Sequence, residues 1–127
     1  MVLIIGGVYQ GKLDYAISTY KLSAVDVFNC CENTDAIPWG CKVINEFEKW
    51  ILALVKSGID VAPKVQEFIH INQDAIVIAN DISCGVVPID GLMRKWREES
   101  SRATGQVAIA SDEILRLYCG IATRLAP

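Results

Sequence analysis

The fold is decided by the stretch Val2-Leu3-Ile4-Ile5-Gly6-Gly7-Val8-Tyr9-Gln10-Gly11-Lys12-Leu13. Its first four residues are a short apolar run that stops at two glycines, which is typical of a buried parallel strand. The segment from Gly11 to Lys21 is expected to form a helix. A strand, a glycine-rich loop and a helix in this order can cradle a phosphate, because backbone N–H groups and the helix N-terminus face the anion together.

The loop itself matches G-x-x-x-x-G-K over Gly6–Lys12 and then departs from the phosphate-loop motif. Leu13 stands where that motif has the Ser or Thr whose hydroxyl holds Mg²⁺. One reading is a glycine-rich turn with a solvated lysine. The other is a phosphate-binding loop in which the lysine contacts the β- and γ-phosphates. The residues of that predicted site are Gly6, Gly7, Gln10, Gly11 and Lys12.

Strand-like and helix-like segments alternate along the rest of the chain, which favours a layered α/β fold. We expect four strands joined by helices, and hence a parallel sheet with Val2–Ile5 and Ala75–Ala79 at its centre, because both are apolar on both faces. The other expected strands are Ala24–Phe28 and Ile114–Cys119. The expected helices are Gly11–Lys21, Lys42–Lys56, Asp60–Ile71, Pro88–Ala103 and a shorter one over Gln106–Ala110.

Composition narrows the class of protein. The chain has 127 residues, 12 Lys and Arg against 15 Asp and Glu, and 52% hydrophobic residues, which predicts a single α/β domain over residues 1–127. A net charge of −3 argues against nucleic-acid binding. No apolar stretch approaches the roughly 18 residues of a membrane span. Five cysteines without CxxC spacing indicate reduced thiols, and we expect a cytoplasmic protein without a signal peptide.

The second half of the chain holds a longer pattern, Asn80-Asp81-Ile82-Ser83-Cys84-Gly85-Val86-Val87-Pro88. It resembles the N-E-V-G-x-G-I-V-P segment of the adenosylcobinamide kinase / adenosylcobinamide-phosphate guanylyltransferase family, the bifunctional enzymes of cobalamin nucleotide-loop assembly. The resemblance covers Met1–Lys21 and about Asp74–Leu125. Similar positions further on are Leu92, Arg94, Trp96-Arg97-Glu98, Arg102, Ala108, Asp112-Glu113 and Gly120-Ile121. The resemblance implies a three-layer P-loop (RecA-like) fold with a mostly parallel sheet, and assembly as a homotrimer.

Departures from the family pattern fall on functional positions. Leu13 ends the phosphate loop. When Val25–Cys30 is aligned with the family's second strand, Asn29 replaces its carboxylate, and asparagine is a weaker ligand for a hard cation. The family's guanylyl-accepting histidine lies in a segment that has no counterpart between Lys21 and Val25. The family's Gly and Asn-Gln further on are replaced by Ser101 and Thr104-Gly105.

These features lead to two hypotheses. The first is a shortened, divergent family member that binds ATP or GTP weakly and nearly independently of Mg²⁺, without guanylyl transfer and with doubtful kinase activity. In this case a corrinoid is a second possible ligand. The alternative is a non-catalytic assembly or regulatory subunit that binds no nucleotide. A kinase in which Asp81 or Glu32 replaces the missing ligands is a third option. No catalytic residue and no metal ligand is assigned.

Two further features carry open alternatives. Asp81 follows the end of a buried strand, where open α/β sheets place ligands. It either contacts Mg²⁺ or a hydroxyl group, or it caps the backbone of Ser83 or Cys84. The basic residues Arg94, Lys95, Arg97 and Arg102 either form a solvated, self-paired helix face or contact phosphate or another subunit. A mean hydropathy of +0.31 favours self-association through apolar surface.

Overall fold

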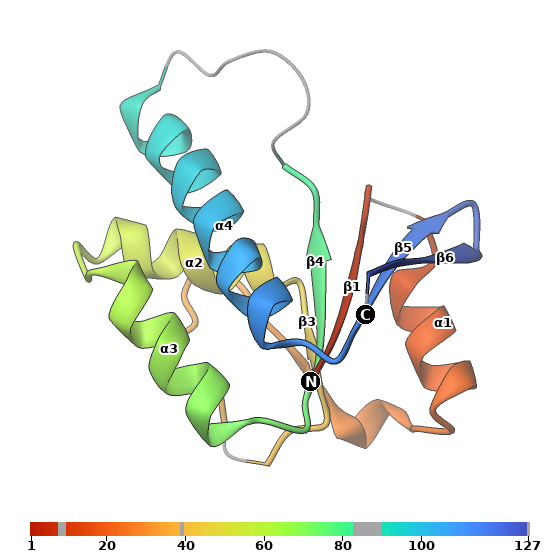
Figure 1. Cartoon of the computed structure of the whole chain (residues 1–127). Helices are drawn as coiled ribbons and strands as arrows, with labels where there is room; N and C mark the ends of the chain where they lie inside the picture. The colour runs from red at the N-terminus through yellow and green to blue at the C-terminus, as the bar shows by residue number, and fades with distance from the viewer. Residues whose placement is uncertain (8–9, 39, 83–89, 127) are drawn as a thin grey trace.

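The computed structural model describes residues 1–7, 10–38, 40–82 and 90–126. A six-stranded sheet lies between two layers of helices (Figure 1). The strands are β1 (Val2–Gly6), β2 (Val27–Asn29), β3 (Val43–Asn45), β4 (Ile76–Asn80), β5 (Glu113–Tyr118) and β6 (Ile121–Ala126). The helices are α1 (Lys12–Thr19), α2 (Phe47–Lys56), α3 (Val61–Ile71) and α4 (Gly91–Ala110), with a 3₁₀ turn at Ala24–Asp26.

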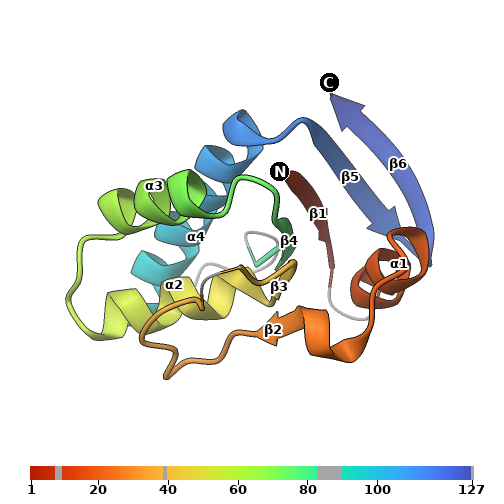
Figure 2. The same ribbon diagram turned by 90° about the horizontal axis from the view of Figure 1, so that it is seen from below.

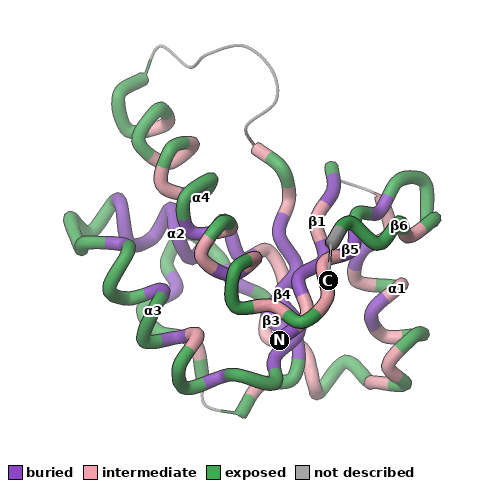
Figure 3. Tube along the Cα trace, viewed as in Figure 1, coloured by how far each residue is buried: buried purple, intermediate pink, exposed green. Residues whose placement is uncertain are grey.

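The strand order is β2-β3-β4-β1-β5-β6. The first five strands in this order pair in parallel, and β6 pairs antiparallel with β5. The strands β4 and β1 therefore occupy the two central positions, as predicted for Ala75–Ala79 and Val2–Ile5. Both are largely buried (Figure 3). The expected three-layer α/β fold with a mostly parallel sheet is confirmed.

The helices divide between the two faces of the sheet (Figure 2). Among the described helices, only α1 packs on one face, where Ala16 lies among Ile4, Ile78 and Leu115. On the other face α2, α3 and α4 form a larger layer, whose core includes Phe47 together with apolar side chains of the strands. Apolar cover on both faces explains why the central strands are continuous runs of Val, Ile and Leu.

The expected helix over Lys42–Lys56 is wrong at its N-terminal end. Val43–Asn45 forms the strand β3, and α2 begins only at Phe47. Glu46 between them has φ 55°, in the left-handed region, so the chain changes direction there. The β-branched side chains of Val43 and Ile44 are fully buried on opposite faces of the sheet, and burial of this kind overrides a helical spacing of apolar residues.

The expected strand Ala24–Phe28 is also displaced. Ala24–Asp26 forms a 3₁₀ turn, and the strand β2 covers Val27–Asn29. The turn is stabilised because the Asp26 carboxylate accepts a hydrogen bond of 2.9 Å from the Ser23 backbone N–H, the exchange typical of a capping box.

The C-terminal part differs from prediction in two respects. The helix α4 runs unbroken to Ala110, so the expected short helix Gln106–Ala110 is its last part. Asp90 caps it and accepts from the Leu92 backbone N–H at 2.8 Å, whereas the expected start at Pro88 lies outside the described residues. The strand β6 was not predicted. It follows a tight turn at Cys119 and Gly120, both with positive φ, which suits a two-residue hairpin.

No helix within the described ranges is long and apolar enough to cross a bilayer.

Candidate functional site

The connections that leave β1 and β4 run to opposite faces of the sheet. The helix that follows β1 lies on one face of the sheet, and the helix that follows β4 lies on the other (Figure 1). The two strands are neighbours with Gly6 paired to Asn80, and the Asp81 backbone N–H donates to the Gly6 carbonyl at 2.9 Å. Open α/β sheets bind ligands at such a switch point, beyond the carboxyl ends of the strands.

Two glycines are required by the backbone at this point. A Cβ on Gly6 would lie 2.6 Å from the Leu117 carbonyl oxygen, so only glycine lets β1 pass this close to β5. Gly11 has φ 82° at the start of α1, a left-handed conformation that favours glycine. Val8 and Tyr9, between these glycines, lie outside the described residues.

Lys12 lies inside the loop and is not solvated. It is 6% exposed, and its ammonium group donates a hydrogen bond to the Gly7 carbonyl. Burial lowers the pKa of Lys12 from its ordinary value, and the negative charge of Glu48 partly opposes this change. The reading of Lys12 as a solvated lysine is therefore wrong. A buried ammonium group beside a helix N-terminus can bind an anion without being desolvated again.

Gln10 fixes the loop through its side chain and its carbonyl group. Its side-chain oxygen accepts from the Cys119 backbone N–H at 2.6 Å, and its carbonyl accepts from Gly120 at 3.1 Å. These bonds attach the loop to the turn between β5 and β6. The side chain of Gln10 therefore tethers the loop, and its predicted part in phosphate binding stays a prediction.

Leu13 and Asn29, the two departures from the metal-binding pattern, lie in different parts of the structure. Leu13 packs beside the apolar cluster between α1 and the sheet. Asn29 ends β2 at the sheet edge, separated from β1 by β3 and β4, and it accepts from the Asn45 side-chain amide at 2.8 Å. With about 4.8 Å per strand, it is too far from the loop to replace a metal ligand there. One of the two grounds for expecting Mg²⁺ independence, the loss of a carboxylate at Asn29, therefore falls away.

Glu48 is a residue of the site that the sequence analysis missed. It is 3% exposed, and its two carboxylate oxygens accept from the backbone N–H and the side-chain amide of Asn80 at 2.8 and 2.9 Å. Its carbonyl accepts from the Trp96 indole at 2.7 Å. A carboxylate within the apolar stripe of a helix, three residues before Ile51 and seven before Val55, is the signal that marks it.

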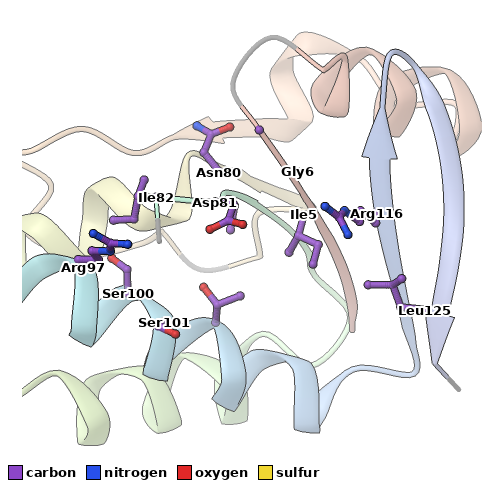
Figure 4. Close-up of a pocket in the computed structure, with 13 residues that line it drawn as sticks. Ile5, Gly6, Asn80, Asp81, Ile82, Arg97, Ser100, Ser101, Arg116 and Leu125 are labelled. Carbon is purple, nitrogen blue, oxygen red and sulfur yellow. The ribbon is translucent and has the colours of Figure 1, made fainter. Parts of the chain in front are cut away.

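A cavity of about 300 Å³ opens beside the switch point, between α4 and the ends of β1 and β4 (Figure 4). Gly6, Gly7 and Asp81 of the predicted set line it, together with Arg97 and Arg116. Asp81 lies between these two arginines in the close-up view. The alternative role of Asp81 as a cap for Ser83 or Cys84 concerns residues outside the described ranges. Among the described residues, no group of three or more His, Cys, Asp or Glu side chains is placed to hold a metal.

The fold and the glycine loop together define a P-loop-like α/β protein. The chain matches the family model for cobinamide kinase / cobinamide phosphate guanyltransferase over residues 39–125, and it belongs to this family. It is also 27% identical over 85 residues to the bifunctional adenosylcobalamin biosynthesis protein CobU of Salmonella typhimurium, an alignment covering 64% of this chain and 46% of that protein. The aligned stretch thus spans about half of the relative's length.

The family match covers only part of the range over which the sequence resembles the family. It includes α2, α3, β4, α4 and β5 but begins at residue 39. The phosphate loop and the segment Val25–Cys30 lie outside it, so the expected resemblance over Met1–Lys21 is not part of the family match. The matched range also includes β3, which ends at Asn45 and is separated from α2 by Glu46 alone.

Proposed function

We propose that this chain is a divergent cobinamide kinase/guanylyltransferase-like protein of cobalamin biosynthesis that binds the phosphates of ATP or GTP. The observation that carries the proposal is Lys12, buried at the first position of α1 and bonded to the carbonyl of Gly7. Family membership supports the setting in corrinoid metabolism. The buried Lys12 and the left-handed Gly11 at the start of α1 support phosphate binding by the loop.

Nucleotide binding would exchange one partner of Lys12 for another. Its ammonium group would leave the Gly7 carbonyl for a phosphate oxygen, a stronger, charge-assisted bond. Backbone N–H groups in the first turn of α1 would donate to the same phosphate. Leu13 gives no metal ligand at this point, so the protein's own groups would carry most of the ground-state affinity. Loss of a metal ligand lowers turnover more than binding, because the metal neutralises charge that develops in the transition state.

Guanylyl transfer by the family route is not part of this proposal. The chain has a single histidine, His70, near the end of α3 and six residues before β4 begins. It therefore lies near the amino end of β4, opposite the edge that holds the phosphate loop.

A non-catalytic oligomeric subunit is the second candidate, favoured by one observation. Tyr118, Ile121 and Leu125 are exposed on the β5–β6 hairpin, at the open edge of the sheet. Exposed apolar residues on an edge strand are typical of a surface that pairs with another copy. We propose a homo-oligomer, a trimer in this family reading. Sedimentation equilibrium tests it, and a monomer at tens of micromolar, on the order where a stable oligomer is populated, would contradict it.

Thermal unfolding with ATP, GTP, Mg-ATP and Mg-GTP tests nucleotide binding. A ligand at 100 times its Kd stabilises the folded state by about 2.7 kcal/mol, so the melting temperature should rise. Lys12→Ala should abolish the rise, whereas Lys64→Ala, an exposed lysine of α3, should retain it. No rise in the wild type with any of the four would favour the non-catalytic subunit.

A further inference from the structure

Two buried groups of opposite charge lie at the switch point. Lys12 is 6% exposed and Glu48 is 3% exposed. The ammonium group of Lys12 donates to the Gly7 carbonyl, whereas the Glu48 carboxylate accepts twice from Asn80. Asn80 pairs with Gly6, the residue before Gly7. The two charges therefore act on each other across neighbouring strand ends, while their hydrogen bonds go to other partners.

Glu48 is held in place at both ends. One carboxylate oxygen accepts from the Asn80 backbone N–H at 2.8 Å, and the other accepts from the Asn80 side-chain amide at 2.9 Å. Its carbonyl accepts from the Trp96 indole at 2.7 Å. To turn away from an anion that enters the loop, the carboxylate would have to leave buried donors without an acceptor, which is costly. The negative charge is thus a fixed part of the site.

This fixed charge has two opposite effects on the loop. Burial lowers the pKa of Lys12 and the charge of Glu48 raises it, so Glu48 stabilises the ammonium form against the neutral amine. The same charge repels an anion bound at Lys12, and charges interact more strongly in the interior of a protein than in water.

Other titratable or charged groups lie on the elements around the loop. They are Asp14 and Tyr15 of α1, Asp81 after β4, Arg116 of β5 and Cys119 in the β5–β6 turn. Among the residues that the structure describes, Glu48 is the charged group that acts on the pKa of Lys12. Its removal should therefore change the behaviour of this lysine directly.

We propose that Glu48 tunes the phosphate loop: its fixed negative charge favours the ammonium form of Lys12 while the loop is empty, and weakens the binding of an anion once that form is present. The inference rests on the proposed binding of ATP or GTP phosphates at Lys12. Glu48 thereby limits the affinity for the anion and widens the pH range over which the loop binds it.

Isothermal titration of ATP without Mg²⁺ into wild type and Glu48→Gln, at a series of pH values from about 8 upward, tests the proposal. The phosphates keep a constant charge in this range, because the last pKa of a phosphate group is about 6. At the lowest pH of the series, Glu48→Gln should bind ATP at least about threefold more tightly, because the repulsion is gone. Its affinity should then fall at a lower pH than that of wild type, because Lys12 loses its proton sooner. Glu67→Gln, which changes an exposed carboxylate of α3, should match wild type throughout.

A merely structural role of Glu48 predicts a different result. Glu48→Gln would then bind ATP more weakly at every pH, with the same pH midpoint as wild type, and this would overturn the proposal. Glu48→Asp keeps the charge but alters the hydrogen bonds, so its pH midpoint should stay that of wild type. This variant keeps the test valid if Glu48→Gln does not fold, because a midpoint below that of wild type in Glu48→Asp would also overturn the proposal.

Titration of Lys12 without nucleotide separates this inference from the proposed function. The NMR signal of the Lys12 ε-carbon, assigned by its absence in Lys12→Met, should titrate at a lower pH in Glu48→Gln than in wild type. If it does so and wild type binds no ATP, the effect of Glu48 on Lys12 is supported and the proposed function is contradicted. If wild type binds ATP and the signal titrates at the same pH in both proteins, the inference is wrong and the proposed function stands.

Discussion

The two faces of the sheet differ in how closely the helices pack against the strands. On the α1 face, Ala16 packs against Ile4, Ile78 and Leu115, and these side chains fill the space. On the α4 face, the helix packs mainly against α2 and α3, and a cavity lies between Arg97, Ser100 and Ser101 of α4 and the strand β1. Close packing at one face supports the loop that holds Lys12. Open space at the other face makes room for a ligand at the same edge of the sheet.

The largest loss of stability should follow from a substitution on the closely packed α1 face, here called the closed face. The α4 face, which has the cavity, is called the open face. Ile78→Ala removes a side chain that is 1% exposed and should lower the free energy of unfolding by about 2–5 kcal/mol. Urea unfolding followed by circular dichroism measures this. Ser101→Leu, on the open face, should change stability by much less, because the cavity has room for the added atoms. A larger loss in Ser101→Leu than in Ile78→Ala would contradict the comparison of the two faces.

Glu48 joins α2 to the end of β4 at the switch point, and its loss should have the next largest effect on stability. Glu48→Ala leaves the two donors of Asn80 without their acceptor and should lower the free energy of unfolding by about 3 kcal/mol. Glu48→Gln should recover part of this, because an amide oxygen can still accept one bond. The exposed Glu67→Ala is the control. If Glu48→Ala is as stable as wild type, these hydrogen bonds contribute nothing to the fold.

Gly6→Ala tests the close approach of β1 and β5. The added Cβ meets the Leu117 carbonyl oxygen at 2.6 Å, so a strand must shift, at a cost of about 1–3 kcal/mol. Gly58→Ala is a useful comparison, since its positive φ is strained for alanine but nothing lies near the added carbon. Stability unchanged in Gly6→Ala would show that the two strands have room to separate.

Ser100→Ala should raise stability slightly. Removal of a buried hydroxyl that has no partner among the residues the structure describes should stabilise the folded state by about 1 kcal/mol or less. A measurable loss of stability in the absence of ligand would indicate that the hydroxyl is satisfied within the protein.

The lowered pKa of Lys12 predicts a change on the alkaline side. Between its lowered folded-state pKa and the ordinary value of 10.5, the unfolded chain binds more protons at this position than the folded one. Stability attributable to Lys12 therefore rises with pH in that window. The difference in unfolding free energy between Lys12→Met and wild type, largest near neutral pH, should shrink as the pH approaches 10.5. A difference independent of pH would mean that burial leaves this ammonium group unperturbed.

The sequence predicted the centre of the sheet because Val2–Ile5 and Ala75–Ala79 are local apolar runs between turn residues. It failed where three-dimensional context decides. The strand β3 has only three residues, and Val43 and Ile44 also fit the helical spacing that continues into α2. The strand β6 depends on pairing with β5 and on the positive φ of Cys119 and Gly120.

The candidate site, too, could be predicted from the sequence only in part. The glycines and Lys12 form a contiguous motif, so sequence spacing was enough to locate them. Glu48 and Asn80 are 32 positions apart, and only the packing of α2 beside β4 brings them together. Similarly, the role of Gln10 as a tether depends on a hairpin that follows more than 100 residues later.

The central claim is that main-chain groups and Lys12 hold a nucleotide phosphate with little help from a metal. Isothermal titration of ATP and GTP, with and without Mg²⁺, tests it most directly when wild type is compared with Lys12→Ala and Leu13→Ser. The account predicts binding by the wild type that changes less than about tenfold, or 1.4 kcal/mol, when Mg²⁺ is added. It predicts no binding by Lys12→Ala and a stronger Mg²⁺ dependence in Leu13→Ser. Nucleotide binding that survives Lys12→Ala, or that requires Mg²⁺ in the wild type, would contradict the account.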